Sequence, residues 1–226
     1  MRSGLVRFVL KSHGVTTLRR PLGEGLCYHV RVQCNNRAFR FRDDVDFQRY
    51  LDTVAEAKIR TGCLLHHYAL MHTHVHLILT TPGPVLLDQV MKRINQKYAR
   101  DYHRRHGRIG HFWMNGYRCS VIDTDTYALA CMRYLDRNGL RAGLVQHPRE
   151  WPWSAYEYYA YGGVSGVIDP HPSYLGLAEE GSVRQYTYRN FVETLLPSDE
   201  MRERKSIIHA MRRYGPEPTN KQSVEK

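Results

Sequence analysis

The chain lacks the cysteine patterns that staple a small extracellular domain or hold a structural zinc ion. Its five cysteines are an odd number and include no Cys-x-x-Cys pair, so a reducing cytosol is the expected compartment. No stretch has enough consecutive apolar residues to cross a bilayer, and no membrane association is expected. Arg2 and Arg7 precede no sustained apolar run, so no secretory signal is expected. The sequence also contains no internal repeat.

Acidic residues are scarce relative to basic ones. The 33 lysines and arginines face 22 aspartates and glutamates, which gives a formal net charge of +11. A strongly basic chain most often meets polyanions, and nucleic acid is the leading candidate, although a basic surface can also be merely solvated. Sixteen tyrosines are interleaved with the arginines. Because aromatic rings stack on unpaired bases while cations hold phosphates, the tyrosines favour nucleic acid as the partner.

Two histidines share one face of a predicted strand. Residues 71–80 are apolar and partly β-branched, and the turn signal Thr81-Pro82-Gly83-Pro84 follows them. Because side chains alternate along a strand, His74 and His76 point to one side while the intervening apolar residues point into a core. Two imidazoles two residues apart form a bidentate platform for a metal ion. Alternatively, both are polar residues on the outer face of an edge strand.

Hydrophobic periodicity and turn signals predict the order β, α, β, β, α, β, α. The predicted strands span 26–32, 63–70 and 71–80, with a further strand or hairpin at 111–122, and the predicted helices span 43–60, 86–104 and 123–138. This order predicts an α+β fold, a ferredoxin-like antiparallel sheet with helices packed on one face. Residues 1–163 are expected to form this domain. Residues 164–226 are expected to form a small C-terminal helical accessory region with a polar tail from Gly215.

The third predicted helix supplies further candidate site residues. Tyr134 and Asn138 lie one turn apart on its face, so a phenol and a carboxamide can point at the same spot. If that spot is the metal platform, Asn138 completes a set of two nitrogens and one oxygen, which suits Mg²⁺ or Mn²⁺. Tyr134 would then be the nucleophile on a scissile phosphate. Alternatively, Tyr134 is a core residue of an amphipathic helix and Asn138 is only its C-terminal residue before Gly139.

Several segments, in order and with consistent spacing over about residues 20–162, carry a family resemblance. They are Tyr28-His29-Val30, Phe41-Arg42-Asp43-Asp44, Tyr68-Ala69-Leu70-Met71, His74-Val75-His76-Leu77, Tyr98-Ala99-Arg100, Arg104-Arg105-His106-Gly107, Gly110-His111-Phe112-Trp113 with Arg118, Arg133-Tyr134, Asn138, Arg141-Ala142-Gly143-Leu144-Val145 and Trp153-Ser154. Together they resemble the REP-associated tyrosine transposases, which are single-tyrosine transposases of the HUH endonuclease superfamily.

This resemblance implies a metal-dependent endonuclease and strand transferase that acts on single-stranded DNA with hairpin-forming repeats. It places the metal ligands at His74, His76 and Asn138 and the nucleophile at Tyr134. Attack by the tyrosine would give a 5′-phosphotyrosine and a free 3′-hydroxyl. The expected cofactor is a divalent metal, Mg²⁺ or Mn²⁺, and the protein is expected to act as a monomer or a homodimer.

Two positions depart from the family pattern. His72-Thr73 stands where Pro-Asn is usual, and Gly139 stands where Pro is usual. We expect His72 to add a third imidazole near the metal and Gly139 to loosen the helix end that holds Asn138.

The arginines near the predicted site are the first candidates for DNA phosphate contacts. These are Arg118, Arg133 and Arg141. Cations of the second predicted helix, Lys92, Lys97 and Arg100, are second candidates. His111 and Trp113 are expected either to stack on bases or to pack in the core.

Two alternatives to a tyrosine transposase stay open. One is a domesticated module that binds DNA or RNA hairpins without cleaving them. The other is a metal-dependent hydrolase that uses an activated water, in which Tyr134 is structural.

Overall fold

A computed structural model of the chain describes residues 23, 25–82, 86–194 and 197–214. The predictions for the basic N-terminal stretch, for most of the Pro-Gly-Pro turn and for the tail from Gly215 lie outside these residues. No helix among the described residues is both long and apolar enough to cross a membrane.

The fold is built on a four-stranded antiparallel sheet. Its strands are β1 (Cys27–Cys34), β2 (Leu64–Met71), β3 (His74–Thr80) and β4 (Trp113–Ile122), in the spatial order β2-β3-β1-β4. The segment predicted as a strand or hairpin at 111–122 is thus one strand. The α+β prediction with an antiparallel sheet is confirmed.

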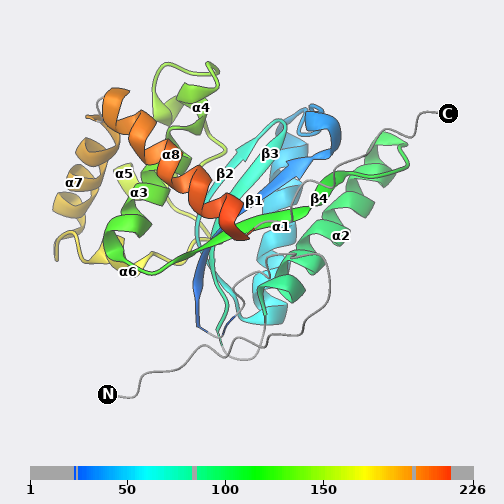
Figure 1. Cartoon of the computed structure of the whole chain (residues 1–226), viewed down its shortest axis with the longest axis horizontal. Helices are drawn as coiled ribbons and strands as arrows, with labels where there is room; N and C mark the ends of the chain where they lie inside the picture. Colours follow the sequence, from blue (N-terminus) through cyan, green and yellow to red (C-terminus); the bar gives the residue numbers. More distant parts are fainter. Residues whose placement is uncertain (1–22, 24, 83–85, 195–196, 215–226) are drawn as a thin grey trace.

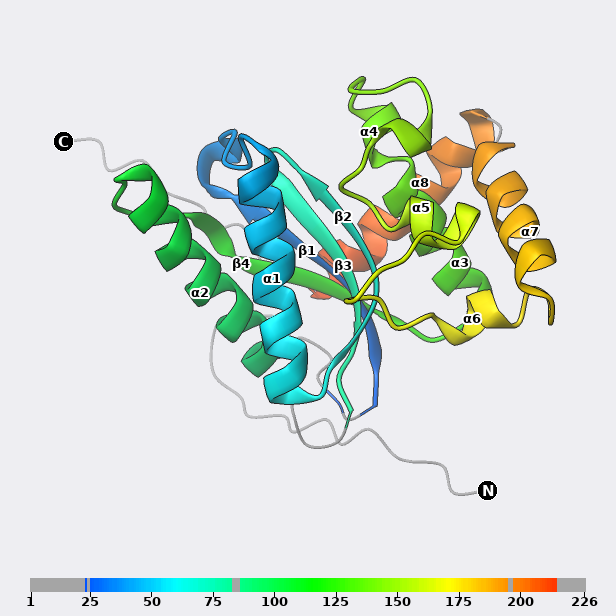
Figure 2. The same cartoon turned by 180° about the vertical axis from the view of Figure 1, so that it is seen from behind.

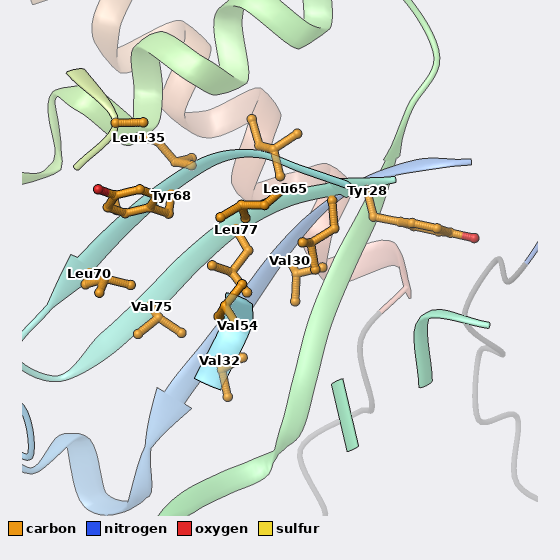
Figure 3. Packing of buried hydrophobic residues seen from close by; sticks show 14 of the residues in the cluster. Tyr28, Val30, Val32, Val54, Leu65, Tyr68, Leu70, Val75, Leu77 and Leu135 are labelled. Atoms are coloured by element: carbon orange, nitrogen blue, oxygen red, sulfur yellow. The ribbon is translucent and has the colours of Figure 1, made fainter. Parts of the chain in front are cut away.

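One face of the sheet carries the alternating apolar side chains and packs against two long helices. These are α1 (Asp44–Thr61) and α2 (Leu87–His106), both on the same face in the two opposite views (Figure 1, Figure 2). Val30, Val75 and Leu77 gather with Val54 of α1 in this core (Figure 3). The side chain of Asp43 caps α1 by accepting a bond from the Asp46 N–H at 3.0 Å.

The opposite face of the sheet, which carries His74 and His76, also meets helices. Figure 1 shows α8 (Pro197–Tyr214) crossing the sheet on the side away from α1 and α2, and Figure 2 shows the same order from behind. Beside it lie α3 (Asp125–Asp136) and α4 (Asn138–Arg141). The predicted one-face packing therefore describes α1 and α2, and the chain adds a second layer on the histidine face.

The C-terminal part packs into the same core. Its other helices are α5 (Tyr156–Tyr161), α6 (Pro172–Leu175) and α7 (Gly181–Glu193), and short 3₁₀ turns occur at Asn35–Arg37 (η1) and Pro148–Glu150 (η2). Tyr188 and Val192 of α7 and Ile207 of α8 are buried with the residues of the sheet. The division between residues 1–163 and 164–226 stays a prediction.

The outer edge of β2 is paired with a loop. The N–H of Leu70 donates to the Trp153 carbonyl at 2.8 Å, and the N–H of Ala155 donates to the Tyr68 carbonyl at 3.1 Å. Further along, the N–H of Asp169 donates to the Leu65 carbonyl at 2.7 Å. These bonds satisfy backbone groups that an edge strand otherwise leaves open.

Candidate active site

Strand register gathers imidazoles and guanidiniums on one sheet face. In the β1–β3 pair Arg31 lies opposite His76 and Gln33 opposite His74, and in the β1–β4 pair Arg31 lies opposite Arg118. Directly opposite residues in an antiparallel pair project to the same face. The alternation predicted for residues 71–80 thus places His74 and His76 away from the α1–α2 core, as expected.

The two predicted metal histidines are neighbours, and a third imidazole supports one of them. The ring centroids of His74 and His76 are 5.1 Å apart. His29 Nε2 lies 2.9 Å from His76 Nδ1, so one ring donates and the other accepts. This bond leaves His76 Nε2 buried without a hydrogen-bond partner in the described part of the chain. His29 therefore holds His76 with its other nitrogen available to a ligand.

Burial keeps these rings neutral. Together with the nearby charges of Arg31 and Arg141, it lowers the pKa of His74 to about 3. Burial likewise lowers the pKa of His29 to about 3 and the pKa of His76 well below its ordinary value. Neutral imidazole is the form that binds metals.

Tyr134 faces this cluster. Its ring centroid is 5.7 Å from that of His76 and 6.1 Å from that of His29, and the side chain is 8% exposed. The guanidinium carbon of Arg141 lies 4.1 Å above the Tyr134 ring. The sheet histidines and the helix tyrosine therefore converge as the sequence predicted.

The helix that carries Tyr134 ends before Asn138. The predicted single helix to Asn138 stops at Asp136, and α4 begins at Asn138 after a break at Arg137. The amide nitrogen of Asn138 donates to the carbonyls of Tyr134 and Leu135, each at 3.2 Å. Its two N–H groups are thus committed to the end of α3, and the carboxamide oxygen is the group left for a ligand.

Gly139 does not act as the predicted helix stop, because it lies inside α4. A Cβ at this position would come within 3.0 Å of Val145 Cγ2 and 3.1 Å of Trp151 Cβ. Glycine permits close packing there, and the loosening of the helix end stays a prediction.

His72 does not join the imidazole cluster. Its Nδ1 lies 2.6 Å from the Phe41 carbonyl, and its ring stacks on Phe39 at 4.4 Å. The residue sits in the turn between β2 and β3, so its expected place near the metal is wrong.

A buried pair anchors α3 to the sheet. His67 Nε2 on β2 lies 3.1 Å from Asp136 Oδ1, and both side chains are fully buried. The Tyr188 hydroxyl of α7 donates to Asp136 Oδ2 at 2.5 Å. Asp136 stands between Tyr134 and Asn138 in the chain, so the Tyr188 hydrogen bond and the close approach of His67 hold the segment that presents both.

A cavity of about 600 Å³ opens beside Tyr134. It lies between the histidine face, α4 and α8 and is lined by Arg31, Gln33, Arg37, Met71, His74, Met114, Gly116, Arg118, Tyr134, Asn138, Arg141, Ala142, Arg204, Ile208 and Met211. Five of these are arginines. The cavity is therefore suited to an anion with several oxygen atoms, such as a phosphate group.

The predicted DNA-contacting arginines fall into different settings. Arg118 and Arg141 line the cavity, and Arg141 also pairs with Glu200 at 3.2 Å. Arg133 does not reach the cavity: its guanidinium pairs with Glu203 of α8 and lies 3.8 Å above the Phe191 ring. A phosphate contact by Arg133 would require that pair to break.

The cations predicted on the second helix lie elsewhere. Lys92, Lys97 and Arg100 line a separate hollow of about 420 Å³ on α2, which packs on the other face of the sheet. Lys97 is also paired, at 3.3 Å from Glu56. Of the two aromatic candidates, Trp113 is half-buried against the core and donates to the Asn95 carbonyl at 3.0 Å, whereas His111 is exposed.

Three site residues were missed: His29, Arg31 and Gln33. Their signal is the alternation in the first predicted strand, where Tyr28, Val30 and Val32 point into the core and the residues between them face the other way.

The donors present fit a divalent cation. Two neutral imidazoles, one with a buried unpaired nitrogen, and a carboxamide oxygen make a mixed nitrogen and oxygen set. Among the described residues no group of three or more histidine, cysteine or carboxylate side chains forms a metal cage. Asn138 lines the same cavity as His74, and its role as a third ligand stays a prediction.

Comparison with known proteins relates the chain to transposases. The family model described as "Transposase IS200 like" matches residues 24–138, just over half of the chain. The chain is similar to a structure of a REP-associated tyrosine transposase bound to a REP hairpin, with 17% identity, a TM-score of 0.53, and coverage of 71% of this chain and 94% of that one.

A candidate transposase from Deinococcus radiodurans, known from a crystal structure, is a more distant likeness. It has 19% identity and a TM-score of 0.39 over 53% of this chain and 91% of its own. No curated protein matches the sequence.

Proposed function

The chain belongs to the IS200-like transposase family, and from that premise we propose that it nicks and rejoins single-stranded DNA with Tyr134 as the nucleophile. The observation that supports this most directly is the convergence of the Tyr134 ring, 5.7 Å from His76, on the cavity that His74 and Asn138 also line. A nucleophile and a set of metal donors thus meet at one anion-binding space.

We propose hairpin-forming repeat DNA as the substrate. The structural relative is described as bound to a REP hairpin, and its chain is covered almost entirely by this one. The basic composition and the arginine-lined cavity support the same partner. A reducing cytosol is the proposed compartment, supported by five unpaired cysteines.

The proposed chemistry is a transesterification. The Tyr134 oxygen attacks the phosphorus, the bond to the 3′ oxygen breaks, and a 5′-phosphotyrosine and a 3′-hydroxyl result. Because the phosphoester is kept, a second 3′-hydroxyl can reverse the step and join a new strand. His74, His76 and Asn138 would hold Mg²⁺ or Mn²⁺, which when bound polarises the phosphate and offsets its growing charge. Arg118 and Arg141 would contact the DNA backbone at the cavity, and Lys92, Lys97 and Arg100 offer a secondary surface on α2.

The test compares Tyr134→Phe with wild type on hairpin-tipped single-stranded DNA with Mn²⁺. We expect a covalent protein–DNA adduct, visible on a denaturing gel, with wild type and none with Tyr134→Phe. Tyr127→Phe is the matched control, because Tyr127 lies on the same helix outside the cavity and bonds to Ser120 at 3.2 Å. Its adduct should form as in wild type.

Two results would contradict the proposal and favour the alternatives. Hairpin binding without an adduct in Mg²⁺ or Mn²⁺ would indicate a domesticated, non-cleaving hairpin-binding protein. Cleavage by Tyr134→Phe with free 5′-phosphate products would indicate a hydrolase that uses an activated water.

A further inference from the structure

Two arginines lie side by side on the sheet face that Tyr134 packs against. Arg31 on β1 and Arg118 on β4 are directly opposite in the strand register, so they project to the same face. Both line the cavity together with Tyr134. Arg31 is also opposite His76 on its other side. Arg31 thus lies between the metal-donor strand and the second arginine.

This pair has no carboxylate partner in the described part of the chain. Among the described residues, the Arg31 guanidinium donates one hydrogen bond, to the neutral amide oxygen of Gln33 at 2.5 Å. Neither Arg31 nor Arg118 lies within 4.0 Å of a described acidic oxygen. By contrast, Arg105, Arg133 and Arg137 each pair with aspartate or glutamate.

Such an arrangement costs free energy unless an anion compensates it. Like charges directly opposite on a sheet repel, and removing a cation from water without a counter-charge is unfavourable. Burial lowers the pKa of Arg31; Tyr134 opposes this shift, and Arg118 and Arg37 add to it. The described residues therefore hold a cationic pair without a compensating carboxylate.

The orientation of Arg31 is also fixed in advance. Gln33 accepts from Arg31 and donates through Nε2 to the Thr73 carbonyl at 3.2 Å, immediately before His74. Most of the five N–H donors of the Arg31 guanidinium have no hydrogen-bond acceptor among the described residues. A guanidinium can donate two parallel hydrogen bonds to two oxygens of a phosphate. Two neighbouring guanidiniums can therefore bind different pairs of oxygens of one phosphate group.

We infer that Arg31 and Arg118 form a clamp for a backbone phosphate of the bound DNA, the phosphate that Tyr134 attacks. This inference rests on the proposed function and deepens it, because it adds Arg31 to the residues that contact substrate. The clamp recognises phosphate chemistry, and free inorganic phosphate shares that chemistry with the DNA backbone.

Binding is measured in the Tyr134→Phe background, so that cleavage plays no part. The probe is hairpin-tipped single-stranded DNA, titrated at several salt concentrations. Arg31→Gln and Arg118→Gln are compared with Arg108→Gln, which removes the same charge from an exposed site outside the cavity. We expect each clamp variant to weaken binding about ten- to a hundredfold. Each should also reduce the slope of log K against log salt by about 0.7–0.9.

Stability distinguishes a clamp from a structural role. In phosphate-free buffer Arg31→Gln should unfold at the same or a higher temperature than the parent, because an uncompensated charge is gone. Inorganic phosphate should raise the unfolding temperature of the parent and have a smaller effect on Arg31→Gln. Arg31→Lys should recover part of the DNA affinity, since it keeps the charge and loses the fork.

Several results would overturn the inference. DNA binding by Arg31→Gln equal to that of Arg108→Gln would do so, as would loss of stability of Arg31→Gln in phosphate-free buffer. A phosphate-dependent shift that Arg31→Gln abolishes while DNA affinity is unchanged would assign the clamp to free phosphate instead.

The experiments distinguish failure of the proposed nuclease activity from failure of the clamp. If wild type forms no adduct but the arginine effects on DNA binding hold, the nuclease fails and the clamp stands. If wild type forms the adduct and Arg31→Gln forms it at the same rate, the clamp fails and the nuclease stands.

Discussion

The hydrogen bond from Tyr188 to Asp136 joins the C-terminal helices to the segment that presents Tyr134. We predict that Tyr188→Phe destabilises the protein while leaving the shape of the side chain intact. The hydroxyl is removed from a fully buried site, and Asp136 Oδ2 loses its 2.5 Å partner. Among the residues that the structure describes, the Asp136 carboxylate then keeps its close approach to His67 Nε2, at 3.1 Å.

The expected loss follows from the kind of bond. A hydrogen bond to a charged group contributes about 1.5–3 kcal/mol, so we take about 2 kcal/mol for the free energy of unfolding. For a chain of this size that corresponds to a fall of about 4–8 °C in Tm. Tyr186→Phe is the control, because Tyr186 lies two residues earlier on the same helix and is 57% exposed. Its effect should stay within about 0.5 kcal/mol.

The free energy of unfolding is measured by urea denaturation of the two variants and by a double-mutant cycle with Asp136→Asn. In the Asp136→Asn background the same Tyr188→Phe change should cost about 1 kcal/mol less, because the acceptor is no longer charged. We also expect slower adduct formation with unchanged DNA binding, since the segment between Tyr134 and Asn138 is held less firmly. Equal stabilities of Tyr188→Phe and Tyr186→Phe, or additivity in the cycle, would refute the reasoning.

Three further predictions concern packing, pH and metal. Gly139→Ala should lower the free energy of unfolding by about 1–3 kcal/mol, because the new Cβ would lie 3.1 Å from Trp151 Cβ. Gly166→Ala is the control, since Gly166 has open space around it and its change should have little effect. Denaturant unfolding of both variants tests this, and equal losses of stability would contradict it. Between pH 6.5 and about 3 an unfolded chain protonates His29 and the folded chain does not, so stability should fall as the pH is lowered through this window, by up to about 1.4 kcal/mol per pH unit for this histidine. His29→Gln should flatten that slope in metal-free protein, and an unchanged slope would show that His29 does not cause it. Mn²⁺ should raise the Tm of wild type but not that of His76→Gln, and chelation should reverse the shift; an equal rise in both proteins would remove His76 from the metal site.

Local patterns in the sequence were sufficient for the parts of the site that depend on one element. The period of a strand put His74 and His76 on one face, and the period of a helix put Tyr134 near Asn138. The break at Arg137 changed the helix boundary without moving either residue away from the cavity. The antiparallel sheet followed from the order of the predicted strands.

Features that depend on pairing between distant segments were not predictable in this way. Arg31 and Arg118 are neighbours because of the register between β1 and β4, and the periodicity within one strand does not determine that register. Arg133 was expected at the DNA because it precedes Tyr134, yet its partner Glu203 lies seventy residues further along the chain. His72 is close in sequence to His74 but occupies the turn, where its Nδ1–H donates to the Phe41 carbonyl.

The loop that borders β2 has a consequence for self-association. An open sheet edge offers backbone groups to any extended chain and thereby promotes aggregation. Here residues 153–155 and Asp169 already occupy those groups along β2. None of these loop residues lines the arginine-rich cavity. Changes that loosen the loop should therefore first lower the solubility of a protein that still forms the DNA adduct.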